Sequence, residues 1–294
     1  MTARDPRLTL ARPDLAARAL RGVVEAARFA EPRPMTVTTP LAPLMRQPGG
    51  ARGLDSELLM GERFDVLDAA NGWCWGQSVA DGYVGFVPEA MLAPGSPAAT
   101  HRVAALTAHL YPEPDIKTRP TALLPRGARL AVAEEVAAKG TSQPMARLGT
   151  REGYVIARHL APVTRLAPDW VAEAESYLGV PYLWGGRSAF GLDCSALLQL
   201  ARQAAGHGCP RDSDMQEAGL GEALAPDTPP ARGDLVSWRG HVGIMLDGER
   251  LLHANAHHMA VAIEPVAETA ARIARTGGGP VTRHARLDAA APAR

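Results

Sequence analysis

The sequence predicts a multi-domain protein in which two small all-β modules are followed by an α+β domain. Three observations support this fold class: a phrase that recurs after about 70 residues, short strand-like runs before position 165, and a helix–helix–sheet order after it. The chain has 294 residues, enough for two or three domains. We expect four segments, namely an N-terminal helical extension, a first and a second β module, and the α+β domain: 1–34, 35–98, 99–164 and 165–294.

The composition is that of a globular protein without charge bias. Apolar residues make up 46% of the chain and charged residues 21%, and acids and bases balance at 31 each. A nucleic-acid partner or a membrane-binding tail is therefore not indicated. Three cysteines are too few for a disulfide scaffold and favour a reducing compartment: Cys74, Cys194 and Cys209.

The first 30 residues show neither a secretory signal nor a membrane span, because Arg and Asp interrupt every apolar run. We therefore expect a cytoplasmic protein. Residues 13–30 begin with Pro13-Asp14 and carry apolar side chains at helical spacing, which predicts one amphipathic helix. The prolines of 31–34 would end it.

Short strands separated by turn residues are predicted for residues 35–163. Asn71-Gly72 and Asp81-Gly82 are hairpin signals in the first β module. The phrase DGYVGFVPEAML of this module aligns with EGYVIARHLAPV of the second, which predicts two tandem copies of one small barrel. Both phrases resemble the closing strands of bacterial SH3-like domains, although the second copy lacks the second glycine.

Cys194 has the position expected of a nucleophile. It comes directly before an apolar-periodic run at 195–206, at the start of a predicted helix. A helix N-terminus lowers the pKa of a thiol and favours the reactive thiolate. The alternative role is a small core residue, which would be expected inside the apolar stripe. Cys209, in a predicted loop, is interpreted as a free thiol.

Two histidines in successive predicted strands could supply a base and an orienting group for Cys194. His241 opens the strand HVGIML, and His253 lies in ERLLHANA. A three-residue loop at 246–248 would place 245 opposite 249 and the two histidines opposite each other. A two-residue loop would put them on opposite faces. A zinc site is a competing hypothesis that no ligand spacing supports, and the serine-hydrolase motif Gly-x-Ser-x-Gly is absent.

The motifs, taken in order, resemble the NlpC-type cell-wall cysteine peptidases, a papain-like family. The matching phrases lie between 166 and about 265: VPYLWGG, LDCSALLQL, PRDSDMQ, RGDLVSW, HVGIML and LLHANA. Paired SH3-like modules are frequent companions of this domain. The resemblance therefore implies two small all-β SH3-like barrels followed by an α+β papain-like (NlpC-type) catalytic domain.

The resemblance also implies roles for individual residues. Cys194 would be the nucleophile, His241 the general base and His253 the third, polar member of the triad. Tyr182 matches the family's tyrosine near the oxyanion site.

Three further residues are implied in substrate binding. Asp193 and Ser195 match positions that bind the free amine of an N-terminal L-alanine in relatives with this domain plan. Tyr83, in the first β module, is the candidate for the tyrosine that caps the same pocket. Outside the resemblance, Asp193 and Ser195 could simply cap the helix, and Tyr83 could belong to the barrel core or rim.

The implied reaction is hydrolysis of the γ-D-glutamyl–L-diamino acid bond in murein peptides with a free N-terminal L-Ala, in cell-wall peptide recycling. No metal or organic cofactor, nucleic acid or membrane is expected to take part. Two alternatives stay open: an amidase or acyltransferase on the same fold, and a non-catalytic murein-binding protein. The sequence does not indicate the preferred diamino acid or the oligomeric state.

Overall fold

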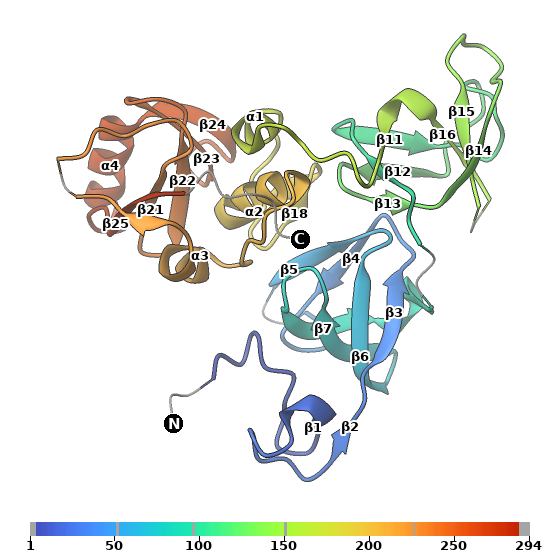
Figure 1. Cartoon of the computed structure of the whole chain (residues 1–294), viewed down its shortest axis with the longest axis horizontal. Coiled ribbons are helices and arrows are strands. Elements are labelled where there is room, and N and C mark those ends of the chain that lie inside the picture. Colours follow the sequence, from blue (N-terminus) through green and yellow to red (C-terminus); the bar gives the residue numbers. More distant parts are fainter. Residues whose placement is uncertain (1–3, 51–52, 96–97, 150–151, 226, 288–294) are drawn as a thin grey trace. The chain divides into compact units, whose positions relative to one another are not determined.

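The chain forms two compact units, Met1–Arg165 and Leu166–Arg294. The computed structural model in Figure 1 describes residues 4–50, 53–95, 98–149, 152–225 and 227–287. The first unit is rich in strands, and the second combines several α-helices with one six-stranded sheet. Within the described residues, no helix has the length and apolar character needed to cross a bilayer.

The helix predicted for residues 13–30 is wrong. Two short parallel strands and a 3-10 turn take its place: β1 (Ala16–Ala17), η1 (Arg18–Leu20) and β2 (Phe29–Ala30). Leu10 and Leu15 are buried in a cluster with Trp75 of the first β module. Packing against this ring overrides the helical spacing of the apolar residues, since local propensity is a weak constraint.

We expect Leu15→Ala to lower the free energy of unfolding of the first unit by about 2–4 kcal/mol, because Leu15 is only 2% exposed. Urea unfolding followed by tryptophan fluorescence measures this. Val23→Ala, at a side chain that is 43% exposed, serves as the control and should be nearly neutral. Equal effects of the two substitutions would mean that the N-terminal segment does not pack on the module.

The first β module consists of a five-stranded sheet, in the order β8-β7-β6-β3-β9, and a separate β4-β5 hairpin. Its strands are β3 (Arg33–Val37), β4 (Leu41–Leu44), β5 (Ser56–Leu59), β6 (Arg63–Ala70), β7 (Trp73–Ser78), β8 (Val84–Pro88) and β9 (Leu92–Pro94). The predicted turn at Asn71-Gly72 joins β6 to β7 with φ values of 53° and 78°. Positive φ at both residues is what a two-residue hairpin turn requires.

The second β module repeats the pairing plan of the first. Its strands are β10 (His101–Val103), β11 (Thr107–Leu110), β12 (Ala122–Pro125), β13 (Arg129–Leu130), β14 (Val132–Val136), β15 (Met145–Leu148), β16 (Tyr154–Ile156) and β17 (Leu160–Pro162). β10 pairs with β13 and β17 just as β3 pairs with β6 and β9, and a β11-β12 hairpin corresponds to β4-β5. A 3-10 turn precedes the last strand of each module: η2 (Glu89–Met91) and η3 (Ala157–His159).

The second unit is built around a six-stranded sheet in the order β20-β25-β21-β22-β23-β24. The strands are β20 (Glu222–Ala223), β21 (Leu235–Trp238), β22 (His241–Met245), β23 (Arg250–Asn255), β24 (Ala260–Pro265) and β25 (Arg283–Arg286). The helices are α1 (Trp170–Glu175), α2 (Cys194–Ala204), α3 (Ser213–Gly219) and α4 (Val266–Arg275), and a small β18-β19 pair (Arg187–Ser188, Gly191–Leu192) precedes α2. Helix α2 contacts β22 and β23, and Figure 1 shows α4 on the other side of the sheet.

Candidate active site

Cys194 is the first residue of α2, as its position before the apolar run predicts. The Asp193 carboxylate caps the helix by accepting the backbone N–H of Ala196 at 2.8 Å. The sulfur accepts the backbone N–H groups of Val242 and Ser195. Since Val242 follows His241 in β22, these contacts bring the buried thiol to the strand that carries the predicted base.

The two histidines lie on one face of the β22–β23 ribbon, but in a different register from the predicted one. The loop is 247–249, not 246–248, because the Asp247 carboxylate accepts the backbone N–H groups of Glu249 and Arg250. The strands therefore pair Ile244 with Leu252 and Met245 with Leu251. The register moves by two residues, which preserves the face of each side chain. The two strands pair only at these two positions, next to the loop. The backbone N–H of Val242, further from the loop, is therefore available to the sulfur.

A hydrogen-bonded relay joins His241 to His253 and Glu264. His241 Nε2 lies 2.8 Å from His253 Nδ1, and His253 Nε2 lies 2.7 Å from a carboxylate oxygen of Glu264. The same oxygen accepts a hydrogen bond from Arg272 of α4. His253 is almost completely buried, at 1% exposure. The relay thus holds the His241 ring by one nitrogen and leaves Nδ1 outside it.

Burial decides the protonation states of the thiol and the base. It raises the pKa of Cys194 to about 12, with the Asp193 charge acting in the same direction. It also lowers the pKa of His241 to about 3, helped by His253 and Arg272 and opposed by Glu264. The resting pair is therefore a neutral thiol and a neutral imidazole. Desolvation opposes the lowering of the thiol pKa that the helix N-terminus is expected to give, and in the resting protein it is the larger influence.

Tyr182 lies beside the thiol. Its backbone forms a parallel bridge with Leu192 and donates to the Met259 carbonyl. Burial, with the Asp193 charge acting in the same direction, raises the pKa of Tyr182 to about 12. The hydroxyl therefore stays protonated and able to donate a hydrogen bond, as an oxyanion partner must.

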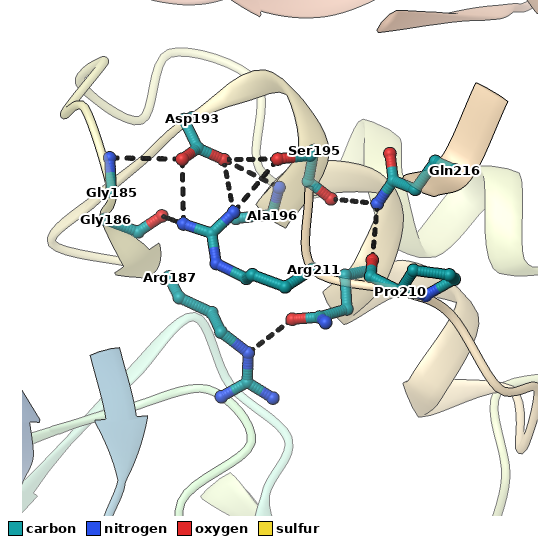
Figure 2. A network of polar contacts seen from close by, with 10 residues as sticks. Gly185, Gly186, Arg187, Asp193, Ser195, Ala196, Pro210, Arg211 and Gln216 are labelled. Atoms are coloured by element: carbon teal, nitrogen blue, oxygen red, sulfur yellow. Dashed lines mark hydrogen bonds and ion pairs between the residues drawn. The ribbon is translucent and has the colours of Figure 1, made fainter. Parts of the chain in front are cut away.

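Asp193 is the centre of the polar network in Figure 2. Arg211, which is 1% exposed, binds both carboxylate oxygens, at 2.9 and 2.7 Å. Ser195 Oγ donates to Asp193 at 3.0 Å and accepts from Arg211 at 2.9 Å, and Gly185 N–H donates to the second oxygen at 3.1 Å. Both oxygens of Asp193 are therefore engaged within the protein, and its binding of a substrate amine stays a prediction.

Gln216 of α3 ties this network to the start of α2. Its side-chain amide donates to the carbonyls of Ser195 and Pro210, at 2.9 and 2.8 Å. It is the glutamine that follows the Pro-Arg-Asp-Ser phrase in the sequence. The phrase thus supplies the groups that hold Asp193 and Ser195 in place.

Tyr83 belongs to the first unit, whereas the other predicted site residues belong to the second. It directly precedes β8 and is 4% exposed, and its backbone N–H donates to Asp81. Its role as a pocket cap stays a prediction.

The sequence interpretation missed Glu264, Arg272 and the pairing of Arg211 with Asp193. One signal was available for Glu264, which alternates with Val261 and Ile263 in a strand-like run. No local signal indicates Arg272, since its partner comes from another element. A set of possible metal ligands is made by His257, His258 and Glu264, whose ligand atoms lie within 4.8 Å of one another.

A buried thiol at a helix N-terminus contacts the backbone of the residue after His241, a histidine that a second histidine holds, and this is the arrangement expected of a cysteine nucleophile and its base. Comparison with known proteins gives the family. The NlpC/P60 family matches residues 179–275, and the bacterial dipeptidyl-peptidase SH3 domain matches residues 44–92. Residues 179–275 of the second unit are thus similar to the NlpC/P60 family, and residues 44–92 of the first unit are similar to an SH3 domain. The second β module lies outside both matched ranges.

Two curated relatives come from Bacillus subtilis (strain 168). The chain is 35% identical to a gamma-D-glutamyl-L-lysine dipeptidyl-peptidase over 130 residues, 40% of this chain and 43% of that protein. It is 38% identical to a gamma-DL-glutamyl hydrolase over 113 residues, 35% of this chain and 27% of that protein. The matches therefore span less than half the length of either relative. A crystal structure of an NlpC/P60 family protein from Bacillus cereus ATCC 10987 shares the fold, with a TM-score of 0.70 at 20% identity, over 86% of this chain and 99% of that one.

Proposed function

We propose that the protein is a cysteine endopeptidase that hydrolyses the γ-D-glutamyl–L-diamino acid bond of murein peptides with a free N-terminal L-Ala. One observation carries the proposal. The Cys194 sulfur accepts the backbone N–H of Val242, and the preceding residue, His241, has its Nε2 atom 2.8 Å from Nδ1 of His253. The curated relatives are named for γ-glutamyl bonds, which supports this bond class.

The first chemical step forms a thioester. The thiol proton of Cys194 passes to Nδ1 of His241 while the sulfur attacks the γ-carbonyl carbon. The negative charge on the carbonyl oxygen would be held by the Cys194 backbone N–H and the Tyr182 hydroxyl. His241 then gives its proton to the leaving nitrogen as the C–N bond breaks, which releases the diamino acid.

The second step regenerates the enzyme. Water, deprotonated by His241, attacks the thioester carbonyl, and the C–S bond breaks to release L-Ala-γ-D-Glu. The sulfur takes the proton back from His241. If an amine entered in place of water, the same steps would transfer the acyl group, so an amidase or acyltransferase remains the second candidate.

The predicted selectivity for a free amine is tested with L-Ala-γ-D-Glu-meso-diaminopimelate and its N-acetylated twin. We expect kcat/KM to be about 10- to 100-fold higher for the free amine, because acetylation removes the charge that a carboxylate such as Asp193 would bind. Mass spectrometry of the released L-Ala-γ-D-Glu measures both rates, and a lysine-containing peptide shows which diamino acid is preferred. Equal rates would mean that Asp193 does not bind the substrate amine and that its role is the structural ion pair with Arg211.

Cleavage of neither peptide would contradict the endopeptidase proposal. Added hydroxylamine would then reveal an acyltransferase, since it captures a thioester as a hydroxamate. We further propose that residues 99–164 form a second SH3-like barrel, supported by the pairing plan that they share with the first β module. Action on murein fragments in the cytoplasm is part of this proposal, and fractionation of the producing cells tests it.

A further inference from the structure

The carboxylate of Glu264 lies behind the histidine pair. Its oxygen is 2.7 Å from His253 Nε2, and the Glu264 side chain is 12% exposed. Arg272 donates to the same oxygen. Hydrogen bonds from His253 and Arg272 lower the pKa of Glu264 although burial opposes them, so the group is ionised at neutral pH.

The local fold explains this placement. In the β23–β24 ladder His253 lies opposite Ala262, and Glu264, two residues further along β24, projects from the same face. The small Ala262 leaves room between the two larger side chains. Helix α4 begins at Val266, directly after Pro265, and brings Arg272 back to Glu264 in less than two turns.

Counting protons along the relay gives a single arrangement. An ionised carboxylate can only accept, so His253 Nε2 must carry its proton. In neutral His253 the other nitrogen, Nδ1, is then bare and can only accept from His241 Nε2. Neutral His241 therefore has its proton on Nε2 and a lone pair on Nδ1. The opposite tautomer of His253 would set two lone pairs, on Nε2 and on the Glu264 oxygen, 2.7 Å apart.

We propose that Glu264 is a positioning residue that fixes the tautomers of both histidines, so that Nδ1 of His241 is the basic nitrogen, and that Arg272 holds Glu264 in place. The inference rests on the proposed cysteine-peptidase function of this site. It extends the predicted triad of Cys194, His241 and His253 by two residues that do not touch the substrate.

The charges around the relay shift the pKa of His241 in opposite directions, which allows the proposal to be tested. Glu264 raises the pKa of His241, whereas Arg272 and His253 lower it. Among the described residues, His258 Nδ1, 3.7 Å from a carboxylate oxygen of Glu264, and His257, whose ligand atom lies within 4.8 Å of that carboxylate, also face it. Removing the negative charge should therefore move the acid limb of thiol reactivity to lower pH, and removing the positive charge should move it to higher pH.

The first test measures how fast Cys194 of the full chain is alkylated by iodoacetamide between pH 2 and 8, read by mass spectrometry of its peptide. For Glu264→Gln we expect the acid limb about half a pH unit lower, and for Arg272→Met about half a unit higher. For peptide cleavage, we expect kcat to fall about tenfold in Glu264→Gln with KM nearly unchanged, because the imidazolium formed in the transition state loses a counter-charge.

Asp234→Asn is the matched control. Its carboxylate is also buried and bound by an arginine, Arg286, at 2.7 Å, and its other hydrogen-bond partner in the described part of the chain is the Ala231 backbone N–H. It should lower stability without moving the acid limb. If the acid limb shifted in the same direction in Glu264→Gln and Arg272→Met, or in neither, the positioning role would be overturned. A purely structural role does not predict shifts in opposite directions.

The second test observes the tautomer of His253 directly. Side-chain ¹⁵N spectra of the wild-type chain should show His253 as the Nε2–H tautomer, and Glu264→Ala should convert part of it to the Nδ1–H form. A wild-type His253 in the Nδ1–H form would overturn the proposal. Neither alkylation nor tautomer state depends on a murein peptide, so failure of the proposed substrate leaves this inference standing, and the reverse also holds.

Discussion

Cys194→Ala is expected to lower kcat/KM for the murein peptide at least about 10⁴-fold, while the dissociation constant of the peptide changes by less than about threefold. The reason is that the sulfur forms the bond to the substrate, whereas the alanine methyl still fits the first turn of α2. Release of L-Ala-γ-D-Glu, followed by chromatography, measures turnover, and calorimetry measures binding. The result separates an enzyme from a murein-binding protein, in which the substitution would leave every measured property unchanged.

Cys209→Ser is the control for this experiment. Cys209 is another buried thiol of the second unit, in no disulfide, and its sulfur contacts the Gln216 amide at 3.5 Å. We expect its activity to stay within about twofold of wild type, since serine retains an acceptor for that amide. Turnover by Cys194→Ala above about 1% of wild type would place the nucleophile elsewhere and end the proposed mechanism.

The parts of the site that the sequence predicts depend on local geometry. The start of α2 can be predicted because Cys194 directly precedes a run in which apolar residues recur every three or four positions. The shared face of His241 and His253 survives an error in the loop, because a shift of two residues changes the partner but not the face. The loop itself depends on the Asp247 carboxylate, which captures two backbone N–H groups and moves the turn by one residue.

The parts that the sequence does not predict depend on contacts between distant segments. Apolar spacing at 13–30 fits a helix equally well, whereas the observed strands pack in a cluster with Trp75, which is distant in the sequence. The pairing of Glu264 with Arg272 requires both the β23–β24 register and the direction of α4. The pKa of Cys194 also depends on contacts between distant segments. A helix N-terminus can be predicted from the sequence, whereas the burial that raises this pKa cannot.

Arg211→Met is expected to lower the free energy of unfolding of the second unit by about 3–5 kcal/mol, the largest effect on stability that we predict. Arg211 is 1% exposed and binds both oxygens of Asp193, so its loss leaves a carboxylate without its cation in a buried site. Hydrogen exchange of the α2 amides in urea reports this unit separately from the first.

A double substitution distinguishes the ion pair from the packing of the long side chain. Asp193→Asn combined with Arg211→Met removes both charges and retains a capping oxygen for the Ala196 N–H, so we expect it to recover at least about 1.5 kcal/mol relative to Arg211→Met alone. Additive losses in the cycle would show that Arg211 contributes packing only. Asp193 would then be free to meet a substrate amine, and the structural pair would no longer argue against that role.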